Sequence, residues 1–413
     1  MTETKLKSPE LLGKITNNCQ LMHVIVLEQQ PSSSRGGQEL NLFEICRTLS
    51  EKGHKISLFY VKPGDLVEKY QEFCEQVIKV NSYGFDRRKM SDIINFLPSF
   101  ADIWKVAAKD NSVVFINQYP DAFYGYLVSL LKKIPFVCYL QIPPPVNPEE
   151  FNLQRRIGMK GVNKFIAVSQ QTKNEWLQEL GLTEDKIDLV YNGTNLEKFK
   201  PAANLAQLRN SWNIPEDTKV ISYVGRLDKD KGLELLIEAF ALFLKTGQKA
   251  KLFIAGKPLL HFSADGKECP LAGEEYKQSL RQIAIDLGIE NSVEFLGHLS
   301  NPTPVYQVSD LTVVPSLWSE PFGRVVIESM ACGTPVVGSR IGGIPEILTD
   351  EFQAGLFEPG NKQDLADTLN KMIDWRDINP QLGARLREYT LNKFSLKSMI
   401  DGVEKVLLNV VEE

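Results

Sequence analysis

Paired cysteines are lacking in this sequence, and so is any zinc-ligand pattern. Its six cysteines are scattered, no two of them form a CxxC motif, and none lies near histidines at zinc-ligand spacing. We therefore expect neither a disulfide framework nor a structural zinc, but free thiols in a reducing cytosol. A chain of 413 residues with 43% hydrophobic content can bury a core in each of two or three domains without such cross-links.

Long hydrophobic runs and an excess of positive charge are lacking too. No stretch of about 18 apolar residues occurs, and residues 1–14 have no apolar signal-peptide core. A net charge of -5 argues against a nucleic-acid partner. We expect a cytoplasmic protein, at most attached peripherally to the inner face of a membrane. Basic groups at residues 87–89, 132–133 and 155–156 form either a face for anionic lipid or an ordinary solvated surface.

What the chain does have is a regular alternation of short apolar runs and longer amphipathic segments. Continuous runs of this length are typical of strands buried on both faces of a parallel sheet, joined by right-handed helical crossovers. The predicted strands of the first half are 21–27, 55–60, 112–116, 136–140, 164–169 and 187–191, and those of the second half are 219–224, 251–255, 293–296, 311–315 and 335–339.

Two such sets predict an α/β protein with two Rossmann-like, doubly wound domains that face each other across a cleft. The polar, Ala-rich stretch from 193 to about 212 is the predicted linker. We place an acceptor-side domain at 1–195 and a donor domain at 196–393. The amphipathic segment of about 394–413 is assigned to the first domain, although its pattern would suit packing on either.

The strongest chemical signal is the stretch from Ser319 to Glu328, which follows a predicted strand. Pro321 suits the first turn of a helix, so Glu320 should lie in the preceding loop and Glu328 within the helix. The N–H groups of Gly323, Arg324 and Val325 would then point toward an anion. The alternative interpretation is that both glutamates are ordinary helix-start and surface charges.

A second signal follows the first strand of the second half. Gly225, Arg226 and Lys231 share a strand-to-helix loop, where open α/β sheets place ligands. Arginine and lysine both suit phosphate oxygens, although two solvated cations in a loop would give the same sequence pattern. Asp228 and Asp230 spell a DxD, but they lie between cations, so we predict no metal there.

Two further glycine-rich stretches complete the walls of the predicted cleft. Gly36 and Gly37 open a helix that ends near His54, and a glycine pair there lets the backbone approach an anion. His54 is interpreted as a helix-end cap. The turn that leads to Glu346 follows another strand, and Glu346 itself is interpreted as a helix N-terminal charge.

Together these motifs resemble the family 4 retaining glycosyltransferases of the GT-B fold. The resemblance extends from His23 to about Ile373. The matching motifs, in order, are GGxE, VS near Ser169, NG at 192–193, GRLxxxKG, LGH at 297, ExxxxxxxE, GxPVV and GGIPE. One such motif would be weak evidence, whereas this many in one order is specific.

The resemblance implies a role for each matching residue. Arg226 and Lys231 would bind the donor diphosphate, and with Glu320 they would form the catalytic set. Glu328 would bind the ribose and Glu320 the transferred sugar. The other implied donor-binding positions are Gly36, Gly37, Gly225, Gly297, His298, Leu299, Phe322, Gly323, Arg324 and Val325.

One departure from the family concerns the acceptor or sugar side. Many relatives have a histidine after the strand at 136–140, where this chain has Gln141. An amide donates and accepts hydrogen bonds but does not titrate, so a proton-carrying role is in doubt here. The departing phosphate is the natural base for the acceptor hydroxyl.

The expected activity is retaining, metal-independent transfer of a sugar from a UDP-, GDP- or ADP-sugar to a glycan, lipid-linked or small-molecule acceptor. The nucleotide-sugar is a co-substrate, and no cofactor is expected. Three alternatives stay open: a non-catalytic sugar-nucleotide-binding relative, a GT-B-fold sugar epimerase, and a glycoside hydrolase that uses Glu320 and Glu328. The hydrolase leaves the phosphate-type loops unexplained.

Overall fold

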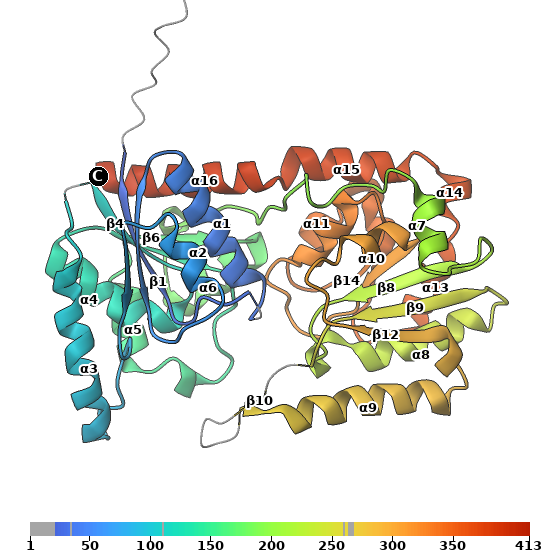
Figure 1. Ribbon diagram of the computed structural model, residues 1–413, viewed down its shortest axis with the longest axis horizontal. Coiled ribbons are helices and arrows are strands. Elements are labelled where there is room, and N and C mark those ends of the chain that lie inside the picture. The colour runs from blue at the N-terminus through green and yellow to red at the C-terminus, as the bar shows by residue number, and fades with distance from the viewer. Residues whose placement is uncertain (1–20, 34, 110, 259–260, 263–267) are drawn as a thin grey trace, which may run out of the picture.

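The computed structural model describes residues 21–33, 35–109, 111–258, 261–262 and 268–413, and Figure 1 shows it as two α/β halves side by side. Cys19 and Ser34 lie outside these residues. Each half contains one parallel sheet, as the alternating sequence pattern predicts. The helices are α1 (Gly37–Glu51), α2 (Val67–Gln71), α3 (Met90–Asp102), α4 (Ala122–Lys132), α5 (Leu153–Lys160), α6 (Gln170–Leu180), α7 (Leu205–Ser211), α8 (Leu233–Leu244), α9 (Pro270–Asp286), α10 (Thr303–Val308), α11 (Arg324–Ala331), α12 (Ile344–Ile347), α13 (Lys362–Met372), α14 (Trp375–Ile378), α15 (Leu382–Lys393) and α16 (Leu396–Glu412).

The first sheet has seven strands in the order β3-β2-β1-β4-β5-β6-β7, all parallel. Its strands are β1 (His23–Glu28), β2 (Lys55–Tyr60), β3 (Gln76–Lys79), β4 (Ser112–Ile116), β5 (Phe136–Leu140), β6 (Lys164–Ala167) and β7 (Ile187–Leu189). The six strands predicted in this half are all present. The edge strand β3 was missed because none of its residues is fully buried, so it carries no long apolar run.

The second sheet has six strands in the order β12-β9-β8-β13-β14-β15, again all parallel. Its strands are β8 (Lys219–Val224), β9 (Ala250–Ala255), β12 (Val293–Gly297), β13 (Leu311–Val314), β14 (Val336–Ser339) and β15 (Leu356–Phe357). The five predicted strands are present, whereas the two-residue β15 and the short antiparallel hairpin of β10 (His261–Phe262) and β11 (Glu268–Cys269) were not anticipated.

Both sheets change winding direction at one position. In the first sheet the order runs outward from β1 to β3 on one side and from β4 to β7 on the other, so the switch point lies between β1 and β4. In the second sheet the corresponding neighbours are β8 and β13. Ligands of open α/β sheets bind at the carboxyl ends of the strands beside such a point.

The chain returns to the first half at its end. Thr194, in the segment after β7, pairs with Ser395 between α15 and α16. Figure 1 shows α15 and α16 along the top of the molecule, with α15 over the second half and α16 over the first. α16 contacts α1, β4 and β6 and buries one apolar face, made of Met399, Ile400, Val403, Val406, Leu407 and Val410. The predicted linker also contains the helix α7, whose N-cap is Asn204.

His54 does cap the end of α1, as predicted, but through its backbone: two residues after the C-cap Lys52, its N–H donates to the Leu49 carbonyl at 3.0 Å. Its imidazole accepts the N–H of Met22 at 3.2 Å and lies 2.8 Å from the Glu404 carboxylate of α16. Lys52, the C-cap of α1, pairs with Glu404 and with Asp401, the latter at 2.7 Å. His54 therefore ends the helix with its backbone, and its side chain also links the start of the first strand to the last helix.

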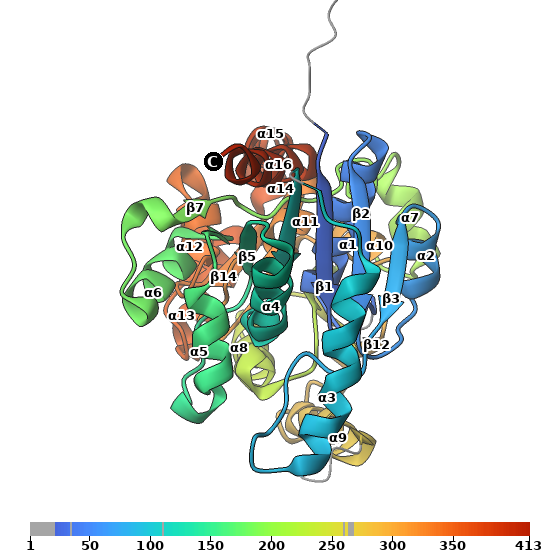
Figure 2. The same cartoon turned by 90° about the vertical axis from the view of Figure 1, so that its left-hand side faces the viewer.

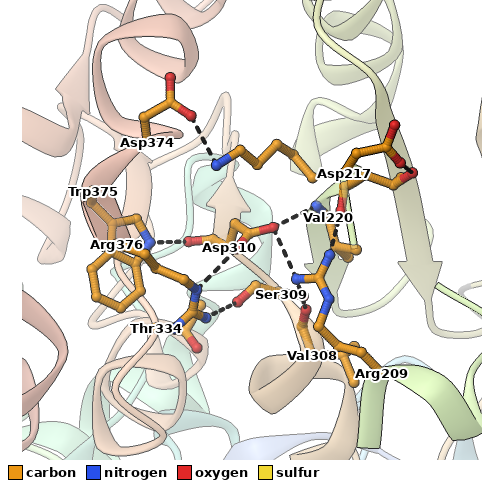
Figure 3. A network of polar contacts seen from close by, with 12 residues as sticks. Arg209, Asp217, Val220, Val308, Ser309, Asp310, Thr334, Asp374, Trp375 and Arg376 are labelled. Atoms are coloured by element: carbon orange, nitrogen blue, oxygen red, sulfur yellow. Dashed lines mark hydrogen bonds and ion pairs between the residues drawn. The ribbon is translucent and has the colours of Figure 1, made fainter. Parts of the chain in front are cut away.

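A buried carboxylate organises the amino ends of the second sheet (Figure 3). Asp310 accepts the N–H of Val220 at 2.8 Å and pairs with Arg209 of α7 at 3.2 Å and with Arg376 of α14 at 3.0 Å. The indole of Trp375 donates to the Asp310 carbonyl at 2.8 Å. This network lies at the opposite edge from the switch point, and its role is to hold α7 and α14 on the sheet.

Among the residues that the structure describes, none of the helices combines the length and apolarity needed to cross a bilayer.

Candidate functional site

The loop after β13 brings two predicted residues together. Glu320 lies in this loop and forms an ion pair with Lys231, which comes from the loop after β8. Ser316 donates its hydroxyl to the same carboxylate at 3.2 Å. The Lys231 ammonium also lies 5.1 Å from the ring centre of Trp318. The pairing follows from the sheet order, because β8 and β13 are neighbours at the switch point.

Helix α11 begins three residues later than the sequence predicts. Gly323 is its N-cap in a left-handed conformation, with φ of 94°, and the first helical residue is Arg324. Pro321 therefore lies in the loop, and its prediction as a first-turn residue is wrong. The buried ring of Phe322 packs beside Tyr191 and Phe394, which anchors the loop just ahead of the helix. The first-turn N–H groups of Arg324 and Val325 have no partners within the helix, as at any helix start.

Glu328 lies on α11 and is only 9% exposed. Its carboxylate accepts the hydroxyl of Tyr306 at 3.0 Å and lies 3.3 Å from the Arg324 guanidinium. Burial together with this carboxylate raises the pKa of Tyr306 well above its ordinary value. The alternative interpretation of Glu328 as a solvated surface charge is therefore wrong, because a buried acid with two polar partners is held in one place.

Hydrogen bonds within the loop after β8 fix its conformation. The hydroxyl of Tyr223 donates to the Arg226 carbonyl at 2.6 Å, and the Arg226 side chain is exposed. Asp228 caps the short 3-10 helix Lys229–Lys231 by accepting the Asp230 N–H at 3.3 Å. One of the two acids of the DxD, Asp228, is thus already engaged as a backbone cap. No group of three or more His, Cys, Asp or Glu side chains in the described part of the chain could hold a metal ion.

The glycine pair before α1 meets an arginine from the other half. Arg324 donates to the Gly37 carbonyl at 2.9 Å. A Cβ on Gly37 would lie 2.8 Å from the Arg324 Cδ, so a side chain at this position would displace the arginine. Gly36 is the N-cap of α1, with φ of 154°. Sequence reasoning used only the backbone N–H of Arg324 and missed this side-chain contact between the two halves.

Three acidic side chains at the switch point of the first sheet were also missed. Glu28 ends β1, Glu39 lies in the first turn of α1, and Asp121 follows β4. Burial raises the pKa of all three, that of Asp121 to about 7, and Arg35 opposes the rise in each case. One oxygen of Glu28 has no hydrogen-bond partner. The sequence signal that could have revealed this cluster is Glu28, a charged residue at the end of an otherwise apolar strand.

Gln141 lies in a network of amides. It accepts from Asn41 at 3.0 Å and donates to Asn117. Asn41 also donates to Asn192 at 3.0 Å, and the hydroxyl of Tyr139 donates to Asn192 at 2.9 Å. None of these amides titrates, and the Gln141 side chain is buried at the carboxyl end of β5. The network fixes Gln141 as a hydrogen-bonding group.

The remaining predicted residues lie further along the second sheet. Gly297 ends β12, with φ of 72°, and its carbonyl accepts the N–H of Gly256 at 2.7 Å. His298 is exposed and Leu299 is partly buried just beyond it. β12 is an edge strand separated from β8 by β9, so these residues stand to one side of Lys231 and Glu320.

Glu346 joins the two halves. It lies in the first turn of α12, as predicted, but its carboxylate accepts the N–H groups of Gln170 and Gln171 at 2.7 and 2.8 Å. These residues open α6 of the first half. α12 is a single turn, and the N-terminus of α6 faces it, so the acid satisfies the longer helix. Ser319 adds a hydrogen bond to Glu175 at 3.1 Å.

The chain matches two protein-family models. Residues 35–198 match the model described as Glycosyltransferase Family 4, and residues 205–392 match the model described as Glycosyl transferases group 1. The two matches follow one another along the chain and divide between the seven-stranded and six-stranded sheets. They extend over nearly all of the region in which the sequence motifs occur.

Relatives are similar along most of their length. An N-acetyl-alpha-D-glucosaminyl L-malate synthase from Bacillus anthracis is 27% identical over 92% of this chain and 96% of its own. A D-inositol 3-phosphate glycosyltransferase from Corynebacterium diphtheriae is 27% identical over 93% and 92%.

Solved structures show the same fold. HepE of Anabaena, in complex with UDP and glucose, has a TM-score of 0.75 at 23% identity and covers 94% of this chain and 99% of its own. A glycosyltransferase from Rickettsia africae has a TM-score of 0.78 at 21% identity and covers 95% of this chain and all of its own.

Proposed function

We propose that this chain, which belongs to the group 1 and family 4 glycosyltransferases of the GT-B fold, transfers a sugar from a nucleotide-diphosphate donor to an acceptor hydroxyl with retention at the anomeric carbon. One observation carries the proposal: Lys231 and Glu320, from two different loops, pair beside the start of α11, and the buried Glu328 lies one turn into that helix. Cationic, carboxylate and backbone N–H groups thus converge where a sugar diphosphate needs them.

Each residue has a role in the proposed reaction. Lys231, Arg226 and the first-turn N–H groups of α11 stabilise the negative charge that develops on the diphosphate as the glycosidic bond breaks. Glu320 accepts hydrogen bonds from hydroxyls of the transferred sugar, and Glu328 accepts from the ribose. Donor binding replaces the Lys231–Glu320 ion pair with contacts to the ligand. The charges are then already in place when they are needed, so little reorganisation is required.

The acceptor is proposed to bind on the side of the first sheet. Gln141 offers a fixed, non-titrating amide there, so the departing diphosphate is proposed as the base that takes the acceptor proton. This leaves a glycan, a lipid-linked molecule or a small molecule as acceptor classes. A cytoplasmic location with peripheral membrane contact belongs to the same proposal.

No cofactor or metal takes part in the proposed step. The positive charge that stabilises the diphosphate comes from Lys231, Arg226 and the start of α11, and Asp228 is already engaged by the backbone. A glycoside hydrolase built on Glu320 and Glu328 is disfavoured, because Glu328 is buried and bound by Tyr306 and Arg324 rather than open to water.

The first experiment is a thermal-shift measurement with UDP-, GDP- and ADP-sugars. HepE binds UDP, so the UDP-sugars come first. A ligand at 100 times its dissociation constant should stabilise the protein by about 2.7 kcal/mol. Glu328→Ala should abolish the shift, whereas Glu388→Ala, on the exposed face of α15, should keep it. No shift with any donor would contradict the proposal.

The rate of sugar transfer tests the proposed role of the Lys231 charge. Lys231→Ala should lower the rate of transfer by about 10²–10³, because one preorganised donor to the leaving group is lost. Lys229→Ala, in the same short helix but exposed, is the matched control and should turn over normally. NMR of the product reports its anomeric configuration. Donor turnover in the absence of any acceptor would favour the sugar epimerase.

A further inference from the structure

Helix α3 presents an apolar stripe to solvent. Met90, Ile94, Leu97 and Trp104 are between 59% and 69% exposed, and Ala101 completes the spacing between the last two. In chain order, the first four of these residues follow one another at intervals of four, three and four, so they share one face of α3. Trp104 follows three residues later, in the short 3-10 helix Ile103–Lys105 that continues α3. Figure 2, which views the first half from outside, shows α3 in front of the sheet and extending toward the lower edge of the molecule.

The opposite face of α3 is firmly packed. Phe96 is buried against Phe85 and Phe123, and Tyr124 donates its hydroxyl to the Ser99 carbonyl at 2.6 Å. The Ser99 hydroxyl accepts the N–H groups of Asn81 and Ser82 at 2.9 and 3.0 Å. The helix is therefore held in place by its inner face, and the outer stripe contributes nothing to the core of this half. A contiguous exposed apolar surface of this kind marks a site of contact.

Cations stand at both ends of the stripe. Arg87, Arg88 and Lys89 precede the helix, and all three side chains are exposed or partly exposed. At the other end the Lys132 ammonium of α4 lies 4.8 Å from the ring centre of Trp104. Lys105 also lies there and pairs with Asp102 at 2.7 Å. An apolar stripe with a terminal tryptophan and flanking lysines and arginines matches the boundary between acyl chains and anionic headgroups.

The stripe is connected to the switch point of the first sheet. The segment that enters α3 contains Tyr83, whose hydroxyl donates to the Glu28 carbonyl at 3.3 Å, at the carboxyl end of β1. A surface that contacts α3 would therefore lie beside the edge of the sheet on which the acceptor is proposed to bind. A protein partner would not require this placement or cations at both ends of the stripe.

We propose that the apolar stripe of α3, with its flanking cations, docks the protein on an anionic phospholipid surface. Ile94, Leu97 and Trp104 enter the headgroup boundary, while Arg87, Lys89 and Lys132 meet lipid phosphates. The proposal is independent of donor and acceptor, because it needs neither for binding. It names the surface through which peripheral contact occurs.

The test is flotation of the full-length protein with vesicles of phosphatidylcholine alone or with about one third phosphatidylglycerol, without any sugar. Binding is expected to the anionic vesicles only and to weaken as salt rises, because the flanking charges are exposed. Replacing Ile94 and Leu97 by Ser should lower partitioning at least about tenfold, since two large apolar groups no longer leave water. Arg87→Glu with Lys89→Glu should weaken binding at low salt more than at high salt.

Ile378→Ser with Leu391→Ser is the matched control, because both side chains are exposed in the other half of the chain. It should bind vesicles as the unchanged protein does. UDP-sugar binding by the α3 variants that equals that of the unchanged protein would show that the variants are folded. Failure of the unchanged protein itself to bind a UDP-sugar would concern the proposed function instead. No vesicle binding, binding that the α3 variants leave intact, or a dimer dispersed by those variants would each overturn the proposal.

Discussion

Burial decides how individual acidic side chains behave in this protein. Glu328 and Asp121 are both buried. Among the residues that the structure describes, the Glu328 carboxylate has two polar side-chain partners and the Asp121 carboxylate has one, the amide of Gln118 at 3.1 Å. Exposed acids such as Asp217, by contrast, form ion pairs in water, here with Lys249 at 2.5 Å. Residue type alone does not distinguish these cases, because the difference lies in the cost of removing a charge from water.

Asp121→Asn should change the pH dependence of stability. Burial raises the pKa of Asp121 from 3.8 to about 7, so between these pH values the folded chain holds a proton that the unfolded chain has released. The free energy of unfolding therefore falls as pH rises from about 4 to 7, by up to roughly 4 kcal/mol from this group. The neutral variant lacks this fall, so it should match the unchanged protein near pH 4 and exceed it above pH 7.

Urea unfolding at pH 4.5 and pH 8 measures the effect as a change in midpoint. Asp367→Asn, on the exposed face of α13, is the control and should give the same difference from the unchanged protein at both pH values. A stability difference for Asp121→Asn that does not grow with pH would show that the carboxylate is ionised in the folded state.

Short helices in this fold depend on partners that are distant in the sequence. α14 is one turn and α7 two turns, and both are held by Asp310 through arginine side chains. The N-terminus of α6 is satisfied by Glu346 from the other half. Isolated helices of this length are unstable in water, so their position is determined by these contacts.

Asp310→Ala should destabilise the second half by about 3–5 kcal/mol, because two guanidinium groups and the Val220 N–H lose their shared acceptor in the interior. Thermal or urea unfolding reports the loss. Asp217→Ala breaks the exposed pair with Lys249 close to the same edge and should have little effect. Equal losses in the two variants would mean that the Asp310 network contributes no more than a surface pair.

Glu346→Ala should loosen the contact between the halves. The N–H groups of Gln170 and Gln171 at the start of α6 lose their acceptor, at a cost of about 1 kcal/mol, and the radius of gyration from small-angle scattering should rise. Glu346→Gln keeps one carboxamide oxygen as an acceptor, so its radius of gyration should lie between those of the unchanged protein and Glu346→Ala. Burial and this carboxylate raise the pKa of Tyr191 to about 12, so the tyrosine should titrate lower in Glu346→Ala. An unchanged radius of gyration would show that the remaining contacts suffice.

At the scale of the whole molecule the two halves are tied by the chain itself. The segment after β7 leads into the second half, and α16 brings the end of the chain back to α1, β4 and β6. The contacts of the Glu404 carboxylate with the Lys52 ammonium and the His54 imidazole add polar links to this apolar contact. The first half is therefore complete only with residues from both ends of the chain. The division at 195 and 393 stays a prediction.

A fragment of residues 1–195 should fail to fold cooperatively, because removing the six buried apolar side chains of α16 leaves their apolar partners exposed. Fusing residues 394–413 to it through a flexible linker should restore a cooperative unfolding transition. Circular dichroism during thermal unfolding distinguishes the two. Replacing Val403 and Leu407 by Ser in the fused helix should cancel the rescue. A cooperative transition in the unfused fragment would contradict the assignment of α16 to this half.

The sequence by itself determined the two parallel sheets and the local placement of several predicted site residues, whose roles stay a prediction. Buried parallel strands are apolar along their length, so their composition marks them wherever they occur. Ligand-binding loops follow such strands, so Arg226, Lys231, Glu320 and Glu328 could be placed on loops and a helix from local pattern alone. The misses are β3, β15 and the β10–β11 hairpin, which are too exposed or too short to carry the pattern.

Only the tertiary structure decided which of these residues meet. Lys231 and Glu320 are 89 positions apart and pair because β13 lies beside β8, an order that local pattern does not encode. The same holds for Arg324 at Gly37 and Glu346 at α6, which depend on how the two halves face each other. Only the tertiary structure also shows that one apolar face of α3 is exposed, because the sequence pattern of an apolar helix predicts burial until its neighbours are known. Hydrophobic pattern is a local property, whereas burial and pairing arise from the packing of the whole chain.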